Sequence, residues 1–361
     1  MSERNALPLP LQIAEIDSAW LTAALRVRFP DIVVEDSELV DVIPGTCTKI
    51  RIRLKLNQAG RDAGVPELVF LKGGFEDHSR AMSHVHLSEV RGYRDVFPFA
   101  SLPTPRCFFA DYDDDRQQGI VIMEDLAAIG VEFCNALRPQ SFDQVARRLS
   151  ALAKFHAQTW ETPELAPGGR LADIPDGESS LRRYMDQYLL KPEEWKRFIE
   201  APRGAAVSTR FHDLQVMTEC FDRLVELADE LPHCVIHGDT HLNNLYVYPD
   251  GTPGFFDSLP GHAPAMREVA YHTTCALDIA DRKRWIGPLI QHYLQELRKH
   301  GVAAPTFDEA FYQYSAFLLD GLIIFIVNES FYQSESTNTA YAARFGSAML
   351  DYDTIGLLLG R

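Results

Sequence analysis

The chain has 361 residues, of which 46% are hydrophobic and 24% charged, a composition typical of a folded globular protein. Its 51 acidic and 35 basic residues give a formal net charge of -16, so the average surface repels phosphate backbones and anionic lipid. We therefore expect neither nucleic acid nor a membrane as a main partner. Because domains commonly contain about 100 to 200 residues, this length predicts two lobes.

Three further features predict a cytoplasmic protein. The six cysteines are scattered without a CxxC pair, which favours free thiols in a reducing compartment. The first ten residues, MSERNALPLP, lack the pattern of a secretory signal. The most apolar run, 316–327, contains Asp320 and is shorter than the ~20 residues that span a bilayer, so it predicts a buried helix.

The first third of the chain predicts an antiparallel sheet with one helix between its strands. Apolar residues at helical spacing follow Asp17, a candidate helix cap, and short alternating segments then indicate strands. The predicted elements, in chain order, are a helix at 17–29, strands at 38–45, 48–56 and 67–74, a helix at 81–97, and strands at 106–113 and 119–126.

The rest of the chain is predicted to be mostly helical. Helices are expected at 141–160, about 180–200, 208–230, 265–279, 282–299, 307–328 and 337–357. Only 233–257 interrupts this pattern, with three strand-like pieces, the last two joined by a Pro-Asp-Gly turn that indicates a hairpin. The fold class is therefore α+β, with a small mixed lobe at 1–126 and a larger helical lobe at 127–361.

Polar side chains gather in the interrupting segment. Asp239 and Asn244 lie five residues apart after the strand-like CVIH, and Asp257 follows at the end of GFFD. Two carboxylates and an amide oxygen suit Mg²⁺, which binds one or two carboxylates and completes its shell with water and phosphate oxygens. One of the three groups can then stay off the metal and act as a base.

A lysine far upstream has an unusual position. Lys72 follows the apolar strand ELVFL, where an ammonium without a partner would be costly to bury. Glu89, in the predicted helix that follows, is a candidate partner. A lysine held in this way is well suited to bind polyphosphate oxygens.

Taken together, these residues resemble the kinase-like phosphotransferases of the aminoglycoside phosphotransferase and choline kinase type, and most closely the ecdysteroid-kinase-like branch. The segments that carry the resemblance are HGDTHLNN (237–244), FFD (255–257), VFLKG (69–73), SEVRGYRDVFP (88–98), VIMEDL (121–126) and LAKFHAQTW (152–160). The resemblance implies a two-lobed protein-kinase-like fold, with a small antiparallel-sheet N-lobe holding one key helix and a mostly helical C-lobe.

The resemblance also implies roles for the polar residues. Asp239 resembles the catalytic base that accepts the proton of the substrate hydroxyl, and Asn244 and Asp257 resemble the Mg²⁺ ligands. Lys72 resembles the lysine on the α and β phosphates of ATP, with Glu89 as its ion-pair partner. ATP and Mg²⁺ are thus the expected cofactors.

The nucleotide would contact two further segments. Met123 to Leu126 would be the hinge, where the backbone of Glu124 and Leu126 could bind the edges of adenine. The phosphate-covering loop would be IPGTCTKI (43–50), which holds only one glycine, so Gly45 and the hydroxyls of Thr46 and Thr48 would have to hold the phosphates.

Two positions depart from the family pattern. Ser258 stands where relatives usually carry a bulky residue after the metal-binding Asp, and Glu268 stands where they usually carry an Asp. His237 is expected to hold the loop rather than act as a nucleophile, and His156 is expected to pack in the core.

The leading interpretation is an ATP- and Mg²⁺-dependent kinase that phosphorylates a hydroxyl group of a small molecule. A pseudokinase that only binds nucleotide or ligand is the main alternative, and a metallohydrolase built on His237, Asp239 and His241 is a weaker one. The acceptor is expected against the helical lobe, with Asp320 and Glu329 as contacts for a cation or aromatic side chains for a larger apolar alcohol. The sequence leaves the oligomeric state open.

Overall fold

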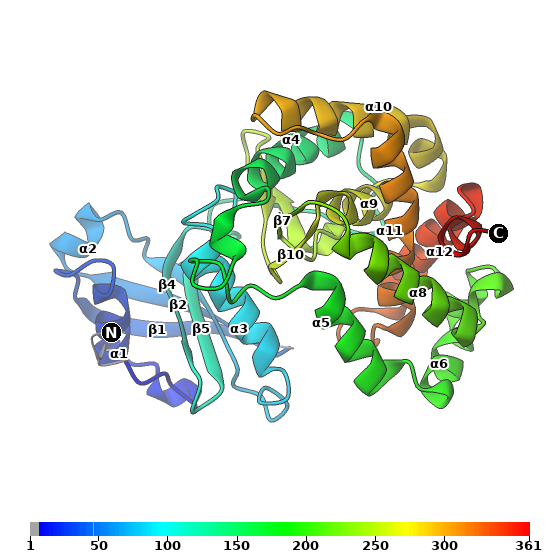
Figure 1. Ribbon diagram of the computed structural model, residues 1–361. Coiled ribbons are helices and arrows are strands. Elements are labelled where there is room, and N and C mark those ends of the chain that lie inside the picture. The colour runs from blue at the N-terminus through cyan, green and yellow to red at the C-terminus, as the bar shows by residue number, and fades with distance from the viewer. Residues whose placement is uncertain (1–6, 46) are drawn as a thin grey trace. The chain divides into compact units, whose positions relative to one another are not determined.

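A computed structural model describes residues 7–45 and 47–361, apart from the side chain of Tyr188 (Figure 1). Its contacts divide the chain into two compact units, Met1–Phe99 with Thr104–Val131, and Ala100–Pro103 with Glu132–Arg361. The sequence placed the boundary between lobes after Leu126, and the contacts place it after Val131.

The first unit is built on a five-stranded antiparallel sheet with the strand order β1-β2-β3-β5-β4. The strands are β1 (Val34–Ile43), β2 (Thr48–Leu56), β3 (Leu68–Gly73), β4 (Cys107–Asp113) and β5 (Gln118–Glu124). The helices are α1 (Ser18–Arg26), α2 (Gln58–Asp62) and α3 (Ser83–Arg91), and α3 continues into a π-helical turn at Gly92–Val96.

Alternation along β5 shows why helices cover both faces of this sheet. Ile120 and Ile122 pack in the cluster that contains Leu25 of α1, whereas Val121 and Met123 pack with Val90 of α3. Successive side chains of a strand point to opposite faces, so each face buries its own apolar set. The continuous apolar run of β5 is the sequence signature of a strand buried on both sides.

The second unit is mostly helical. Its helices are α4 (Phe142–Thr159), α5 (Gly177–Tyr184), α6 (Pro192–Ile199), α7 (Pro202–Ala205), α8 (Leu214–Asp229), α9 (Ala265–Ala276), α10 (Ile279–Lys299), α11 (Phe307–Val327), α12 (Glu335–Asp351) and α13 (Thr354–Leu359). Its short strands are β6 (Glu132–Phe133), β7 (His233–Ile236), β8 (Leu245–Val247), β9 (Pro253–Phe255) and β10 (Gly261–Pro264). The pairs are β6-β8-β9 and β10-β7, all antiparallel.

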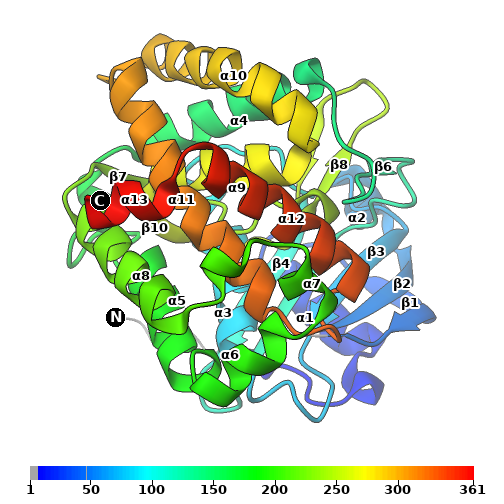
Figure 2. The same cartoon turned by 90° about the vertical axis from the view of Figure 1, so that its right-hand side faces the viewer.

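Packing in the second unit places the short strands among long helices. Helix α4 packs along α10, and α11 packs against both α9 and α12 (Figure 2). The predicted hairpin is present as β8 and β9, which pair from Leu245 with Phe255 to Val247 with Pro253. The sequence did not predict β10, the partner of β7.

Two helices expected as single elements are each broken. The predicted helix at about 180–200 is α5 with a π-helical turn, then α6, which begins at Pro192 because a proline disfavours helical backbone in the residue before it. The predicted helix at 337–357 is α12 followed by α13, separated at Asp353, whose φ of 45° is left-handed.

The apolar segment predicted as a buried helix forms the second half of α11. By length and composition alone α11 could cross a membrane, but 78% of its most apolar window is buried inside the structure. It is therefore a core helix of the second unit, as the sequence predicted. The six cysteines are free thiols, which also agrees with the sequence prediction.

A buried arginine joins three helices of the second unit. Arg203 of α7 is 1% exposed, and its guanidinium donates to the Phe325, Ile326 and Asn328 carbonyls at the C-terminus of α11. It also forms an ion pair with Glu335 in the first turn of α12. This ion pair, opposed by partial burial, lowers the pKa of Glu335 from about 4.5 to about 2.

Glu335→Gln is expected to lower the free energy of unfolding at pH 7 by about 1–3 kcal/mol, because it replaces the carboxylate that forms an ion pair with the buried Arg203 by a neutral amide. A lowered folded-state pKa means that the stabilisation is present above the unfolded-state value and is lost as the pH falls from about 4.5 to about 2. Denaturant titrations at pH 7 and pH 3 would measure this, with Glu230→Gln, an exposed glutamate, as the control. If Glu335→Gln lost the same free energy of unfolding relative to the parent at pH 7 and at pH 3, the ion pair with Arg203 would not be the cause of the lowered pKa.

Candidate functional site

The loop after β7 begins with a glycine that no other residue can replace without strain. Gly238 has a φ of 88°, and a Cβ built on it would lie 1.9 Å from the backbone oxygen of Leu259. The chain needs this close approach because Leu259 N donates to the His237 carbonyl oxygen at 2.9 Å. The glycine of the HGD motif is therefore a requirement of the backbone.

A buried glutamate holds the same loop from α9. One carboxylate oxygen of Glu268 accepts from Gly238 N at 2.9 Å, and the other accepts from His237 N at 3.1 Å and from His156 Nε2 at 2.9 Å. His156 in turn hydrogen-bonds through Nδ1 to the hydroxyl of Tyr293 at 2.8 Å. His156 is thus the packed core histidine that the sequence predicted, and Glu268 anchors the backbone ahead of Asp239.

Helix α9 uses one face to organise the loop. Glu268, Tyr271 and His272 are spaced i, i+3 and i+4, so they lie on the same side of the helix. Tyr271 OH donates to Asp239 Oδ1 at 2.9 Å, and His272 Nδ1 lies 3.1 Å from the Thr240 carbonyl oxygen. Burial lowers the pKa of His272 to about 4, so its ring is neutral and Nδ1–H donates to that carbonyl.

The Asp239 carboxylate is fixed by three side chains. Besides the Tyr271 hydroxyl, Asn244 Nδ2 donates to Oδ2 at 2.8 Å, and His241 Nε2 lies 3.4 Å from the same oxygen. Partial burial alone would raise the pKa of Asp239, but the neighbouring His241 and Tyr271 lower it below its usual value. The side chain is 24% exposed, so an ionised, oriented carboxylate remains open to a ligand.

The residues predicted to bind Mg²⁺ lie next to each other in the second unit. Phe256 N donates to the Asn244 carbonyl oxygen at 3.0 Å, which brings the residue after it, Asp257, beside Asn244. Asp257 has a left-handed φ of 53°, a conformation that costs about 1–2 kcal/mol and recurs at functional sites. Ser258, which follows it, is buried.

This donor set fits a hard cation. Because the amide nitrogen of Asn244 donates to Asp239, its amide oxygen is the atom left to coordinate a metal. One amide oxygen and the Asp257 carboxylate provide the few oxygen ligands that Mg²⁺ takes from a protein when phosphate and water supply the rest.

In the first unit, Lys72 and Glu89 form a buried ion pair. Lys72 Nζ lies 2.5 Å from Glu89 Oε1, and the two side chains are only 6% and 8% exposed. The pair links β3 to α3 and fixes the ammonium, which otherwise would be costly to bury. The binding of phosphate by Lys72 stays a prediction.

The hinge segment at the end of β5 is held by residues that the sequence did not single out. Arg51 Nε of β2 lies 2.5 Å from a carboxylate oxygen of Asp125, whose side chain is 3% exposed. Glu124 N donates to the Arg106 carbonyl oxygen at 2.9 Å, so of the two Glu124 backbone groups the carbonyl is the one left to bind an edge of adenine. Met123 and Leu126 are buried on either side.

The predicted phosphate loop agrees less well with its expected role. Thr46 lies outside the described residues. The Gly45 carbonyl oxygen lies 3.0 Å from His78 Nε2, which leaves its amide as the group that could face phosphate. Thr48 is fully buried at the start of β2 and its hydroxyl donates to Glu76 at 3.0 Å, so its contact with phosphate stays a prediction that this hydrogen bond does not favour.

The two acidic residues suggested for a cationic acceptor are both paired with arginines. Asp320 is 3% exposed and lies 2.5 Å from Arg267 Nε, and Glu329 lies 2.5 Å from Arg197. Both carboxylates thus already have a cationic partner within the protein, and their contact with an acceptor stays a prediction. Among the aromatic side chains of this unit that could contact a larger apolar alcohol, Phe317 is buried in the core.

A cavity in the second unit does not help to place the acceptor. It has a volume of about 570 Å³ and is lined mainly by apolar residues, among them Trp160, Met266 and Tyr293. Since Asp239 is not among its lining residues, the cavity gives no argument for an acceptor site.

Comparisons with known proteins agree with the fold and the motifs. No curated protein sequence matches the chain. Among solved structures, a microcompartment-associated aminopropanol kinase is 16% identical, with a TM-score of 0.50 over 93% of this chain and 98% of its own. A putative aminoglycoside phosphotransferase from Ralstonia eutropha JMP134 is 11% identical, with a TM-score of 0.50 over 92% of this chain and 96% of its own.

At these identities the two structures establish the fold alone, and it is the predicted kinase-like fold, with an antiparallel-sheet N-terminal unit and a helical C-terminal unit. The family is established by sequence. The model of the ecdysteroid kinase-like family matches residues 100–301, more than half of the chain, and this segment includes the loop of Asp239 and the face of α9 that holds it. The chain therefore belongs to the ecdysteroid kinase-like family of kinase-like phosphotransferases, which confirms the resemblance inferred from its motifs.

Proposed function

We propose that this protein is an ATP- and Mg²⁺-dependent kinase that transfers the γ-phosphate of ATP to a hydroxyl group of a small molecule. The observation that carries the proposal is the Asp239 carboxylate, which is ionised, partly exposed and oriented by Tyr271, Asn244 and His241. A carboxylate has about four sites that can accept a hydrogen bond. Two of these accept from Tyr271 and Asn244, and His241 lies 3.4 Å from Oδ2, so a further site can accept the hydroxyl of a substrate.

Asp239 would act as the base in the transfer step. The substrate oxygen forms a bond to the γ-phosphorus, the bond from that phosphorus to the β–γ bridging oxygen breaks, and the hydroxyl proton passes to a carboxylate oxygen of Asp239. In a loose transition state the proton leaves late, so an ionised carboxylate in the right place is enough and a raised pKa is not needed.

The other residues would bind and orient the nucleotide. Asn244 and Asp257 would hold Mg²⁺ through their side-chain oxygens, and the ion when bound neutralises phosphate charge. In the first unit, Lys72, fixed by Glu89, would contact the α and β phosphate oxygens. The Gly45 amide would also bind the phosphates, and the hinge of Met123 to Leu126 would bind adenine. A cytoplasmic location, where thiols stay reduced, is part of this proposal.

The acceptor class is to be found by experiment. The purified protein would be screened for ATP consumption with alcohols, sugars, aminoglycosides, choline, steroid-like polyols and amino alcohols, the last because a structural neighbour is named for aminopropanol. Asp239→Asn is the blank. We expect at least one acceptor to give ATP consumption and a phosphorylated product with the parent protein and neither with the blank.

A pseudokinase is the second candidate, favoured by the phosphate loop in which Thr48 is buried against Glu76. The same screen separates the two. Nucleotide binding without transfer to any acceptor class would favour the pseudokinase, and Asp239-dependent transfer to one of them would exclude it.

A further inference from the structure

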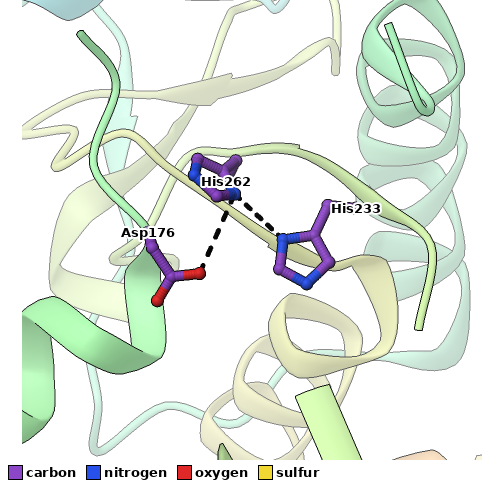
Figure 3. Close-up of side chains that lie close together, drawn as sticks. All are labelled: Asp176, His233 and His262. Atoms are coloured by element: carbon purple, nitrogen blue, oxygen red, sulfur yellow. Dashed lines mark hydrogen bonds and ion pairs between the residues drawn. The ribbon is translucent and has the colours of Figure 1, made fainter. Parts of the chain in front are cut away.

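Three side chains outside the residues assigned to phosphoryl transfer converge in the second unit. Asp176 precedes α5, His233 begins β7 and His262 lies in β10. One ligand atom of each lies within 4.8 Å of the other two, and within the described residues no other group of His, Cys, Asp or Glu meets this criterion. Figure 3 shows the ring of His262 between the carboxylate and the second ring.

The His233 ring is fixed so that one nitrogen faces the cluster. Its Nε2 lies 2.9 Å from the Ala228 carbonyl oxygen, which can only accept, so Nε2 carries a hydrogen. In neutral His233 the lone pair is then on Nδ1, which lies 2.9 Å from Nδ1 of His262. Histidines that bind metals typically donate their second ring N–H to a carbonyl or carboxylate in this way.

The Asp176 carboxylate also presents one oxygen to the cluster. Oδ1 caps α5 by accepting from Ser179 N at 2.7 Å, and Oδ2 lies 3.9 Å from His262 Nδ1. The distance of 3.9 Å is longer than a hydrogen bond, so Asp176 Oδ2 and His262 Nδ1 face each other without a hydrogen bond between them.

Backbone hydrogen bonds hold the three segments together. Residues 233–236 of β7 pair with β10, in which His262 is opposite Val235. His262 N donates to the Pro175 carbonyl oxygen at 2.9 Å, and Asp176 forms a parallel bridge with His262. The ligand atoms are therefore placed by fixed backbone, which a metal site requires.

We propose that Asp176 Oδ2, His233 Nδ1 and His262 Nδ1 form a binding site for a divalent transition-metal ion, with Zn²⁺ as the preferred ion. Two imidazoles and one carboxylate are a common ligand set for zinc, with water in the fourth position. Zn–N and Zn–O distances near 2.0–2.1 Å at tetrahedral angles separate ligand atoms by about 3.4 Å. Two of the observed separations, 2.9 and 3.9 Å, lie on either side of this value and the third is at most 4.8 Å, so side-chain rotations would bring the three atoms around one ion.

Exposure and position also suit this ion. The Asp176 and His262 side chains are each 26% exposed, which leaves an entry path and room for water. The site differs in chemistry from the oxygen donors of Asn244 and Asp257, because imidazole nitrogen favours Zn²⁺ over Mg²⁺. A bound ion would tie the start of α5 to the two strands that lead into the Asp239 loop and α9.

The test is a Zn²⁺ titration of the full chain, freed of metal, in competition with a chromophoric chelator. The variants are Asp176→Asn, which keeps a helix cap, and His262→Gln, with His300→Gln, an exposed histidine, as the matched control. We expect one site in the parent and the control, and an affinity loss of at least about 10-fold in Asp176→Asn and more in His262→Gln, since even outer partners of metal ligands contribute 10- to 100-fold.

Thermal unfolding gives a second readout. Zn²⁺ in excess over its Kd should raise the Tm of the parent and of His300→Gln, and this rise should be absent in His262→Gln and reduced in Asp176→Asn. If His262→Gln does not fold, Asp176→Asn still decides the question. Equal Zn²⁺ affinity in the parent and both cluster variants, or no binding by the parent, would overturn the proposal, and the contact between His233 and His262 would then be a hydrogen bond only.

Discussion

Asp239→Asn is expected to lower the kcat of phosphoryl transfer by about 10²- to 10⁴-fold, the range attributed to a positioned general base. The asparagine has nearly the same shape, and its one amide oxygen can accept from Asn244 while its amide nitrogen donates to the Tyr271 hydroxyl, which can act as an acceptor, so the loop should keep its geometry. It cannot take the proton of the substrate hydroxyl. Because Asp239 is not assigned a contact with the nucleotide, nucleotide affinity should change by no more than a few-fold.

The measurement is steady-state kinetics with the best acceptor from the screen, together with a fluorescence titration of nucleotide. Asp250→Asn is the matched control, because Asp250 is exposed in the β8–β9 turn and its Oδ1 accepts from Thr252 N at 2.9 Å, which asparagine can also do. Transfer by Asp239→Asn within a few-fold of the parent would show that Asp239 is not the base.

Gly238→Ala is expected to lower the free energy of unfolding by about 3 kcal/mol or more. The positive φ alone costs an alanine about 1–2 kcal/mol. In addition, its Cβ would meet the Leu259 backbone oxygen at 1.9 Å, so the loop or the Leu259 backbone must move. The hydrogen bond from Gly238 N to Glu268 would be strained, and kcat should fall because Asp239 is the next residue.

Gly301→Ala separates the two contributions. Gly301 has almost the same φ, 87°, but no atom lies within 4 Å of a Cβ built there. This control should lose only about 1–2 kcal/mol, the cost of the left-handed conformation. Denaturant unfolding of both variants gives the comparison. An equal loss of stability would mean that the close approach of residue 238 to Leu259 can relax without cost.

Local patterns were enough to predict most elements of the fold. Alternating apolar residues predicted the strands of the first unit, and helical spacing predicted the long helices of the second. The predictions failed where one residue interrupts a helical pattern, at Pro192 and at Asp353, since periodicity alone does not show where a helix must end. They also missed β10, whose four residues form a strand only because β7 lies beside them.

The candidate site was predicted from spacing and from one resemblance, and these supplied Asp239, Asn244, Asp257, Lys72 and Glu89. Of the three side chains that fix the Asp239 carboxylate, Asn244 was predicted, but only as a metal ligand, and Tyr271 was not singled out. Tyr271 could have been found from its place three residues after Glu268 on one helix face, but only the structure shows that this face meets the loop.

The sequence by itself determined the family, the order of most strands and helices, and the polar residues proposed to act on ATP and its acceptor, because these depend on residue type and on short spacings. Tertiary structure decided which side chains have partners. It buried Thr48 against Glu76, paired Asp320 with Arg267, and brought His262 to His233, 29 positions away, with Asp176 beside them. Such contacts join residues distant in the chain, and they arise only when packing and strand pairing fix the backbone between them.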